Sequence, residues 1–160
     1  SVVRNKEIGF IFQGFNLIQN LTALENVELP LIYRNVPAAE RRRLSEESLK
    51  RVGLEKRMDH KPTEMSGGQQ QRVAIARALA AAPPLILAGE PTGNLDSKSS
   101  REIMDILRKL HTEGRTVILI THDDKIAQSA KRIIRIMDGK IESDSGMADP
   151  KSMEEENGEK

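Results

Sequence analysis

Three side chains that can take part in chemistry follow apolar, strand-like segments. They are Gln13, Glu90 and His122, after residues 8–12, 85–88 and 116–121, with Gly89 between the second segment and its carboxylate. Ligands of open α/β sheets bind beyond the carboxyl ends of the strands, so we expect the three to converge. An amide, a carboxylate and an imidazole around one pocket suit the activation of a water molecule. A lone histidine after a strand is more often structural, so the hypothesis depends on all three.

A fourth group lies in residues 65–72, MSGGQQQR. Ser66 and Gln69 have the spacing of a capping box, which predicts a helix start at Ser66. Backbone N–H groups at a helix start and the helix dipole favour an anion, and glycines let a phosphate approach the backbone closely. A simple capping box would explain Ser66 and Gln69, but not the paired glycines followed by three glutamines. The run therefore predicts a phosphate site.

The elements that must position these groups alternate between strands and helices. Further strands are expected at residues 133–137 and 140–142, as a hairpin turning at Asp138-Gly139. Expected helix starts are Thr22 (N-cap, with Glu25 completing a capping box), Pro37 (first helical position), Ser66, Asp96 or Ser97, and Asp123. We expect Pro30 to disturb the first helix, and Gly53, Ala82 and Gly114 to mark the ends of the next three. This alternation indicates an α/β domain in which residues 85–88 and 116–121 are central parallel strands, the latter buried on both faces.

Composition narrows the class of protein. The 160 residues fit one domain, and 38% hydrophobic residues with 2% aromatics predict an aliphatic core. The 25 basic and 24 acidic residues argue against a nucleic-acid binder that relies on a basic field. The absence of cysteine excludes disulfides, and no apolar run approaches the roughly 18 residues of a membrane span. The first residues lack the apolar core of a signal peptide, and we expect the chain to begin inside a domain.

The basic run Arg41-Arg42-Arg43 allows two interpretations. It could be a phosphate or nucleic-acid patch, or one face of a solvated helix that pairs its own charges. Oppositely charged residues four apart, such as Arg42 with Glu46, Arg43 with Glu47 and Glu47 with Arg51, favour the second interpretation.

Five motifs, which follow one another along the chain in the family's order, resemble those of ATP-binding cassette (ABC) ATPases. Ser66-Gly67-Gly68-Gln69-Gln70 looks like the signature motif, with Met65 where Leu is usual. Four other runs resemble the Q-loop (Gln13 in FIFQGFNL), the Walker B strand (residues 85–90), the D-loop (GNLD, ending at Asp96) and the switch histidine (His122 in ITHDD). The runs NLTALENVELPLIYR and EPTGNLDS are most similar to the subfamily of lipoprotein-releasing and macrolide-export transporters.

The resemblance implies a P-loop NTPase-like α/β fold with a parallel sheet core. A helical signature subdomain would span about residues 22–82, the partial cassette residues 1–143, and a disordered acidic tail residues 144–160. Cassettes of this family pair head to tail. Ser66, Gly67 and Gly68, with Gln69, would therefore meet the γ-phosphate of ATP held by the partner cassette.

The resemblance also implies the other roles at the site. Glu90 would polarise the attacking water, and His122 would hold the γ-phosphate and Glu90 in register. Gln13 would approach Mg²⁺, and Asp96 would lie beside the nucleotide. A transmembrane permease subunit would contact the loop after Gln13. The cassette would then be cytoplasmic, on the inner face of the cell membrane.

Two features depart from the family pattern. The glycine spacing of a P-loop, G-x-x-x-x-G-K-[ST], occurs at Gly9–Gly14, but Phe15-Asn16 follows instead of Lys and a hydroxyl. We therefore expect the P-loop and its strands to be missing upstream. Gly89 stands where the family has the Walker B aspartate that supports Mg²⁺. Two hypotheses follow: an ATP-hydrolysing subunit of an export-type ABC transporter, or a truncated or degenerate cassette that is inactive by itself.

Overall fold

The computed structural model describes residues 8–146. By their contacts the residues form two compact units, Ser1–Ile120 and Thr121–Lys160. Among the described residues, no helix is both long enough and apolar enough to cross a membrane.

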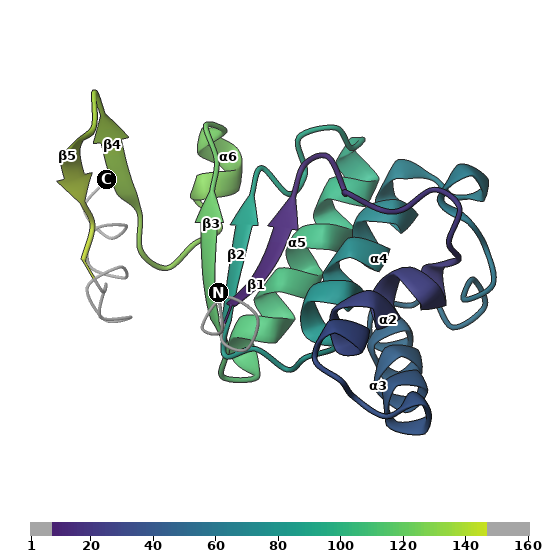
Figure 1. The fold of residues 1–160 in the computed structure, drawn as a ribbon. Coiled ribbons are helices and arrows are strands. Elements are labelled where there is room, and N and C mark those ends of the chain that lie inside the picture. The colour runs from purple at the N-terminus through teal and green to yellow at the C-terminus, as the bar shows by residue number, and fades with distance from the viewer. Residues whose placement is uncertain (1–7, 147–160) are drawn as a thin grey trace. The chain divides into compact units, whose positions relative to one another are not determined.

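The first unit is built on a parallel sheet of three strands, β1 (Ile8–Phe12), β2 (Leu85–Gly89) and β3 (Thr116–Ile120), in the order β1-β2-β3 (Figure 1). In both pairings the strands are in register, so that Phe12, Gly89 and Ile120 lie side by side. The three carboxyl ends therefore meet at one edge, as the α/β prediction requires.

Helices cover one face of this sheet. The helices of the unit are α2 (Ala23–Tyr33), α3 (Ala38–Arg51), α4 (Gly67–Leu79) and α5 (Ser97–Thr112), with a short 3-10 helix, η1 (Pro62–Glu64). α4 packs on β1 and α5 on β3, while α2 and α3 pack against α4 (Figure 1). The strand residues beneath the helices, Ile11, Ile86 and Ala88, are fully buried. The core is aliphatic, as the composition predicts.

The opposite face of the sheet contradicts one prediction. Ile118 is 44% exposed and Ile120 is 55% exposed, so β3 is not buried on both faces. The reason is its place in the sheet. β3 is an edge strand of the described sheet, so the prediction that it is a central strand is also wrong. The side chains that point away from α5 have no covering helix within the described part of this unit.

The helix ends follow the local signals to within three residues. Thr22 and Glu25 form the expected capping box of α2, which continues through Pro30 without ending there. Pro37 is the N-cap of α3 rather than its first helical residue, because its ψ of 148° is extended. Gly53 follows α3 with a φ of 77°, which suits glycine. α4 ends at Leu79, three residues before the predicted end at Ala82.

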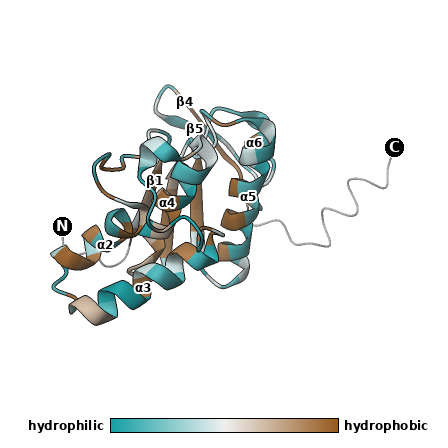
Figure 2. Cartoon of the chain, turned by 90° about the vertical axis from the view of Figure 1, so that its right-hand side faces the viewer, coloured by the Kyte–Doolittle hydropathy of each residue, from teal (hydrophilic) through white to brown (hydrophobic). Residues whose placement is uncertain are grey.

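The arginine run on α3 largely pairs its own charges. Arg42 bonds Glu46 at 3.0 Å, and Arg43 bonds Glu47 at 3.0 Å. Arg51 pairs with Glu113 instead of Glu47, so that predicted pair is wrong. Figure 2 shows most of α3 as hydrophilic. The interpretation as a solvated, self-paired helix is confirmed.

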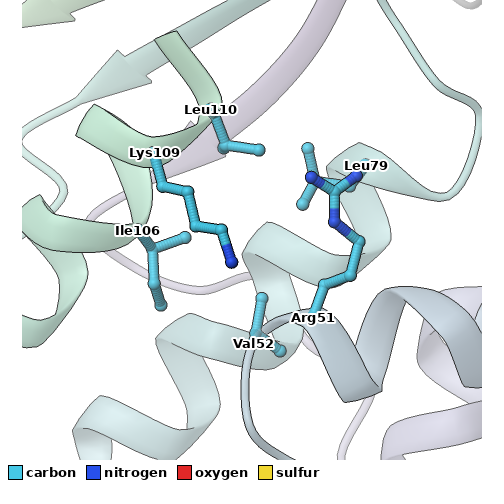
Figure 3. Close-up of a pocket in the computed structure, with 6 residues that line it drawn as sticks. All are labelled: Arg51, Val52, Leu79, Ile106, Lys109 and Leu110. Atoms are coloured by element: carbon cyan, nitrogen blue, oxygen red, sulfur yellow. The ribbon is translucent and has the colours of Figure 1, made fainter. Parts of the chain in front are cut away.

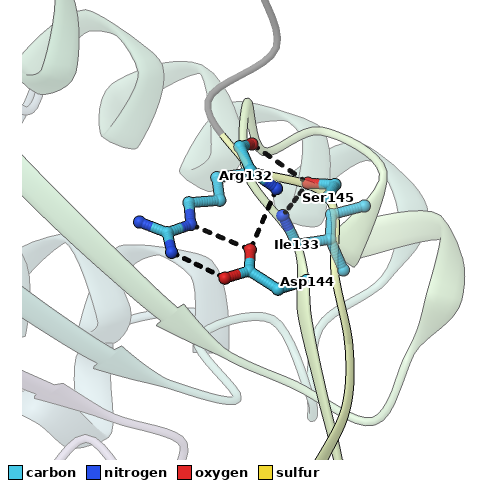
Figure 4. Close-up of polar contacts among 5 residues, drawn as sticks. Arg132, Ile133, Asp144 and Ser145 are labelled. Atoms are coloured by element: carbon cyan, nitrogen blue, oxygen red, sulfur yellow. Dashed lines mark hydrogen bonds and ion pairs between the residues drawn. The ribbon is translucent and has the colours of Figure 1, made fainter.

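The second unit contains α6 (Asp124–Ala127) and a hairpin of β4 (Ile134–Met137) and β5 (Lys140–Asp144). Its turn is the predicted Asp138-Gly139, with φ values of 50° and 74°. Arg132 makes two bonds to Asp144, and Ser145 accepts a hydrogen bond from the amide of Ile133 at 2.9 Å (Figure 4). Residues 144–146, which the sequence assigned to the tail, are thus part of this hairpin region. The rest of the predicted tail, 147–160, lies outside the described residues.

Candidate functional site

Gln13 and Glu90 leave neighbouring strand ends. Because Phe12 pairs with Gly89, the residues that follow them start side by side at the carboxyl edge of the sheet. The Nε2 of Gln13 donates a hydrogen bond to Oδ1 of Asn94 at 2.9 Å. A Cβ atom on Gly93 would lie 2.7 Å from Cδ of Gln13, so a larger residue there would displace the Gln13 side chain. The side chain of Gln13 therefore packs against the loop that Glu90 begins.

The backbone of Glu90 is left-handed. Its φ is 44°, which is uncommon for a residue with a side chain. The amide of Glu90 still donates to the carbonyl of Ile120 at 2.8 Å, and its carbonyl accepts from Gly93 at 3.2 Å. The chain thus turns sharply just beyond the sheet edge, where the sequence predicts a working carboxylate. Strained residues of this kind cluster at functional sites.

The start of α4 has the geometry that its sequence predicts. The hydroxyl of Ser66 accepts from the amide of Gln69 at 3.2 Å, and Oε1 of Gln69 accepts from the amide of Ser66 at 3.0 Å. Ser66 is exposed and Gly67 is half-buried. An α-helix N-terminus with such a surface position can receive an anion.

The two glycines of this motif differ in their surroundings. A Cβ atom on Gly67 would lie 3.3 Å from Cδ2 of Leu95 and 3.8 Å from Cζ of Phe15. On Gly68, which is buried, it would lie 2.8 Å from Oγ and 3.0 Å from Cβ of Ser99. Gly68 therefore allows α4 to pack closely against α5. This packing reason was not visible in the sequence, because Ser99 is distant along the chain.

Asp96 has a clear structural task. It is the N-cap of α5, and its Oδ1 accepts from the amide of Ser99 at 2.7 Å. This backbone hydrogen bond lowers the pKa of the Asp96 carboxyl. Of the two predicted caps, Asp96 and Ser97, the structure uses Asp96. A contact of Asp96 with nucleotide stays a prediction.

Two side chains of α4 were missed by sequence reasoning. Gln71 is fully buried, and its Nε2 donates to the carbonyls of Pro91 at 2.6 Å and Phe12 at 3.3 Å. Arg77 donates to the carbonyls of Asn16 at 2.7 Å and Phe15 at 2.9 Å, and burial lowers the pKa of its guanidinium. Arg77 could have been noticed as a polar residue in the apolar second half of the helix, whereas Gln71 lies in the polar run of residues 69–72 and gave no such signal.

His122 is the second residue of the second unit, and only Thr121 separates it from β3 in the chain. The next residue, Asp123, caps α6 through its side chain and donates its amide to Oγ1 of Thr121 at 3.0 Å. That His122 joins Gln13 and Glu90 stays a prediction.

The donor set at the sheet edge fits Mg²⁺ poorly. Within residues 8–146 no group of three or more His, Cys, Asp or Glu side chains could hold a metal ion. Gly89 supplies no oxygen ligand, whereas Mg²⁺ prefers near-ideal octahedral oxygen coordination. The backbone does not demand glycine there: a Cβ atom on Gly89 would meet only Cδ1 of Phe12, at 3.9 Å.

A small pocket lies elsewhere in the first unit. Its lining residues come from the last turns of α3, α4 and α5 and include Arg51, Leu79 and Lys109 (Figure 3). α5 starts just after the loop of Glu90 and runs for 16 residues, so its last turn lies roughly 20 Å away from that loop. The pocket is therefore separate from the candidate site.

Known proteins match this chain over most of its length. The model of the family described as ABC transporter matches residues 2–93. An uncharacterized ABC transporter ATP-binding protein of Thermotoga maritima is 57% identical, over 88% of this chain and 60% of the relative. The macrolide export ATP-binding/permease protein MacB of Escherichia coli is 55% identical, over 90% of this chain and 22% of the relative.

A solved structure agrees with the fold. The dimeric structure of MJ0796, a bacterial ABC transporter cassette, is 51% identical with a TM-score of 0.79, covering 92% of this chain and 66% of that one. A second structure of the same cassette is a dimeric post-hydrolysis state bound to ADP and Pi. The chain thus spans less than two thirds of these relatives.

Proposed function

Because this chain belongs to the ABC transporter family of ATP-binding cassettes, we propose that it serves ATP hydrolysis in an export-type transporter. The observation that carries this proposal is the start of α4. Ser66 and Gly67 lie at the surface, at the N-terminus of a 13-residue helix whose side chains reach the loops of Gln13 and Glu90. Phosphoryl transfer depends chiefly on positioning and charge stabilisation, which such a frame supplies.

The proposed site forms between two cassettes. MJ0796 is described as a dimer, and we propose that this chain also pairs head to tail with a cassette. Ser66, Gly67 and Gly68, with Gln69, would then approach the γ-phosphate of ATP bound to the partner. The amide of Gln69 already donates to the Ser66 hydroxyl. The amides of Gly67 and Gly68, at the first two helical positions, lack intrahelical acceptors, so they can stabilise charge that develops on the phosphate oxygens.

Glu90 is the proposed general base. Its carboxylate would take a proton from the attacking water, while His122 holds the γ-phosphate and Glu90 in register. Gln13, which lies against the Glu90 loop through Asn94, would sense the nucleotide. Asp96 would contribute beside the nucleotide as well as capping α5.

The proposed partner is a transmembrane permease. The MacB relatives are described as joined ATP-binding and permease proteins. Ile18, in the loop after Gln13, is an apolar residue that is 48% exposed, so it suits a contact with another protein. The cassette would thus lie on the inner face of the cell membrane.

A second candidate function concerns the 160 residues alone. They contain no G-x-x-x-x-G-K-[ST] run, and Gly89 replaces a metal-supporting carboxylate. By itself this chain would therefore be non-enzymatic and would lend its α4 face to an intact cassette. Calorimetry of the purified chain should show negligible ATP binding, and micromolar affinity would overturn this idea.

The base is tested in a full-length version of the cassette that carries Gly89→Asp. Glu90→Gln keeps the size of the side chain and removes the base, so ATP turnover should fall by roughly 10²- to 10⁴-fold while ATP still binds. Glu142→Gln, the same change in an exposed residue of β5, is the control. If the Glu90→Gln protein kept its turnover, Glu90 would not be the base.

A further inference from the structure

The fully buried amide of Gln71 connects the two loops of the candidate site. Its Nε2 donates to the carbonyl of Pro91 at 2.6 Å and to that of Phe12 at 3.3 Å. Pro91 directly follows Glu90, and Phe12 directly precedes Gln13. The side chain of Gln71 thus bonds the backbone next to both Gln13 and Glu90, two residues of the proposed site.

The contact uses both donors of the amide group. The NH₂ group has two hydrogens, and each is directed to one carbonyl. Among the described residues, Oε1 of Gln71 has no hydrogen-bond partner. Turning the amide over would place this oxygen against two carbonyl oxygens, so the observed orientation is fixed. A buried polar atom without a partner costs stability, which an apolar side chain of the same length would avoid.

The place of the contact also matters. The ladder between β1 and β2 ends at the pair of Phe12 and Gly89. Pro91 lies beyond the last ladder pair, where the sheet no longer fixes its distance from β1. Gln71 spans this gap from α4, the helix whose first residues form the proposed phosphate site.

We propose that Gln71 is a positioning residue for ATP hydrolysis, which sets the separation of the Gln13 and Glu90 loops and ties both to α4. This inference rests on the proposed function. Arg77 supports the same frame, because it bonds two carbonyls farther along the Gln13 loop, those of Phe15 and Asn16. Movement of α4 would then move the base and the amide together.

Hydrogen exchange of the 160-residue chain tests this frame without nucleotide. Gln71→Met keeps the side-chain length and removes both donors. The amide of Gly93, bonded to Glu90, and that of Phe15, bonded to Phe12, should exchange roughly tenfold faster. The amide of Ala80, bonded to Ala76 on α4, should keep its rate. Gln128→Met, the same change at an exposed position of the second unit, should alter none of these.

Equal acceleration of all three amides would mean that Gln71 only stabilises the fold, and no acceleration would mean that it holds neither loop; either result overturns the inference. If the Gln71→Met variant fails to fold, the exchange rates of the Gln71 Nε2 hydrogens in the unchanged protein provide the test. These hydrogens should exchange more slowly than those of Gln70, which is part-buried, and equal rates would overturn the inference.

Turnover separates positioning from binding. In the full-length Gly89→Asp version, Gln71→Met should lower kcat on the order of 10²-fold with an unchanged KM for ATP, because a misplaced base slows only the chemical step. A changed KM with an unchanged kcat would overturn the positioning role. A failure of the proposed function would give a different pattern of results. ATP turnover would then survive Glu90→Gln, while the faster hydrogen exchange of Gln71→Met would still be observed.

Discussion

At the scale of single residues, Gly89 is a position that glycine occupies without a structural reason. It lies between Phe12 and Ile120 in the middle strand, and the nearest atom to an added Cβ is Cδ1 of Phe12 at 3.9 Å. Its φ is not in the left-handed range. The neighbouring Glu90 shows the opposite: its φ of 44° is left-handed, a conformation that favours glycine, yet the residue carries a side chain.

The first prediction therefore concerns Gly89. Gly89→Ala should raise the free energy of unfolding of the 160-residue chain by about 0.4–1 kcal/mol, because alanine has less conformational freedom when unfolded and fits the strand. Urea denaturation measures this. A loss of stability would show that the site has less room than the structure indicates.

A second variant at position 89 tests the hypothesis that a carboxylate there supports Mg²⁺. Gly89→Asp restores a carboxylate beside Glu90, and Mg²⁺ should then shift the urea midpoint upward. Gly89→Ala is the matched control, because it changes the backbone in the same direction without adding a ligand. Equal shifts in the two variants would mean that the ion acts elsewhere.

At the scale of elements, the approach of α4 to α5 depends on Gly68. The distances of 2.8 Å and 3.0 Å to Ser99 leave no room for a methyl group. We predict that Gly68→Ala lowers the free energy of unfolding by about 1–3 kcal/mol, as overpacked sites do. Gly67→Ala should cost less, because the end of Leu95, at 3.3 Å, can move aside.

A second change checks that the clash with Ser99 is the cause. Ser99→Gly removes the contacting atoms, so it should restore much of the stability lost in Gly68→Ala. Thermal unfolding of the two single variants and the double variant gives the coupling free energy. Additive losses in the double variant would place the strain of Gly68→Ala elsewhere.

The hairpin of the second unit supplies a prediction about pH. The guanidinium of Arg132, with the amide of Gly146, lowers the pKa of Asp144 to about 2 (Figure 4). Because the folded pKa lies below the ordinary 3.8, the contact stabilises the hairpin above that value and is lost as pH falls toward 2. Carboxyl NMR titration should show the low midpoint, and Arg132→Gln should move it toward 3.8.

At the scale of the whole molecule, local signals predicted most elements. The capping boxes at Thr22 and Ser66 and the turn at Asp138 involve residues three or fewer apart, so the sequence alone could specify them. The bonds of Gln71 and the contact of Gly68 join residues 20 or more apart, and no local pattern encodes them. The prediction that β3 is buried on both faces was wrong, because burial depends on which elements cover a strand. Apolar side chains make burial possible but do not show what covers them.

The uncovered sheet face leads to the last prediction. The face away from α5 carries two register rows of apolar side chains. One row contains Phe10, Leu87 and Ile118, and the next contains Phe12 and Ile120, each of which is more than two-fifths exposed. An apolar face beside an edge strand promotes association of chains. We predict that the 160-residue chain self-associates as its concentration rises, and that Ile118→Lys reduces this association with little effect on stability.

Sedimentation velocity over a concentration series measures the effect, and the matched control is Tyr33→Lys. Tyr33 is 79% exposed at the end of α2, away from the sheet, so this variant adds the same charge and removes a comparable apolar side chain. If the sheet face causes the association, only Ile118→Lys should shift the distribution toward monomer. An equal shift in both variants would mean that net charge alone governs association, and the uncovered face would then have no special role.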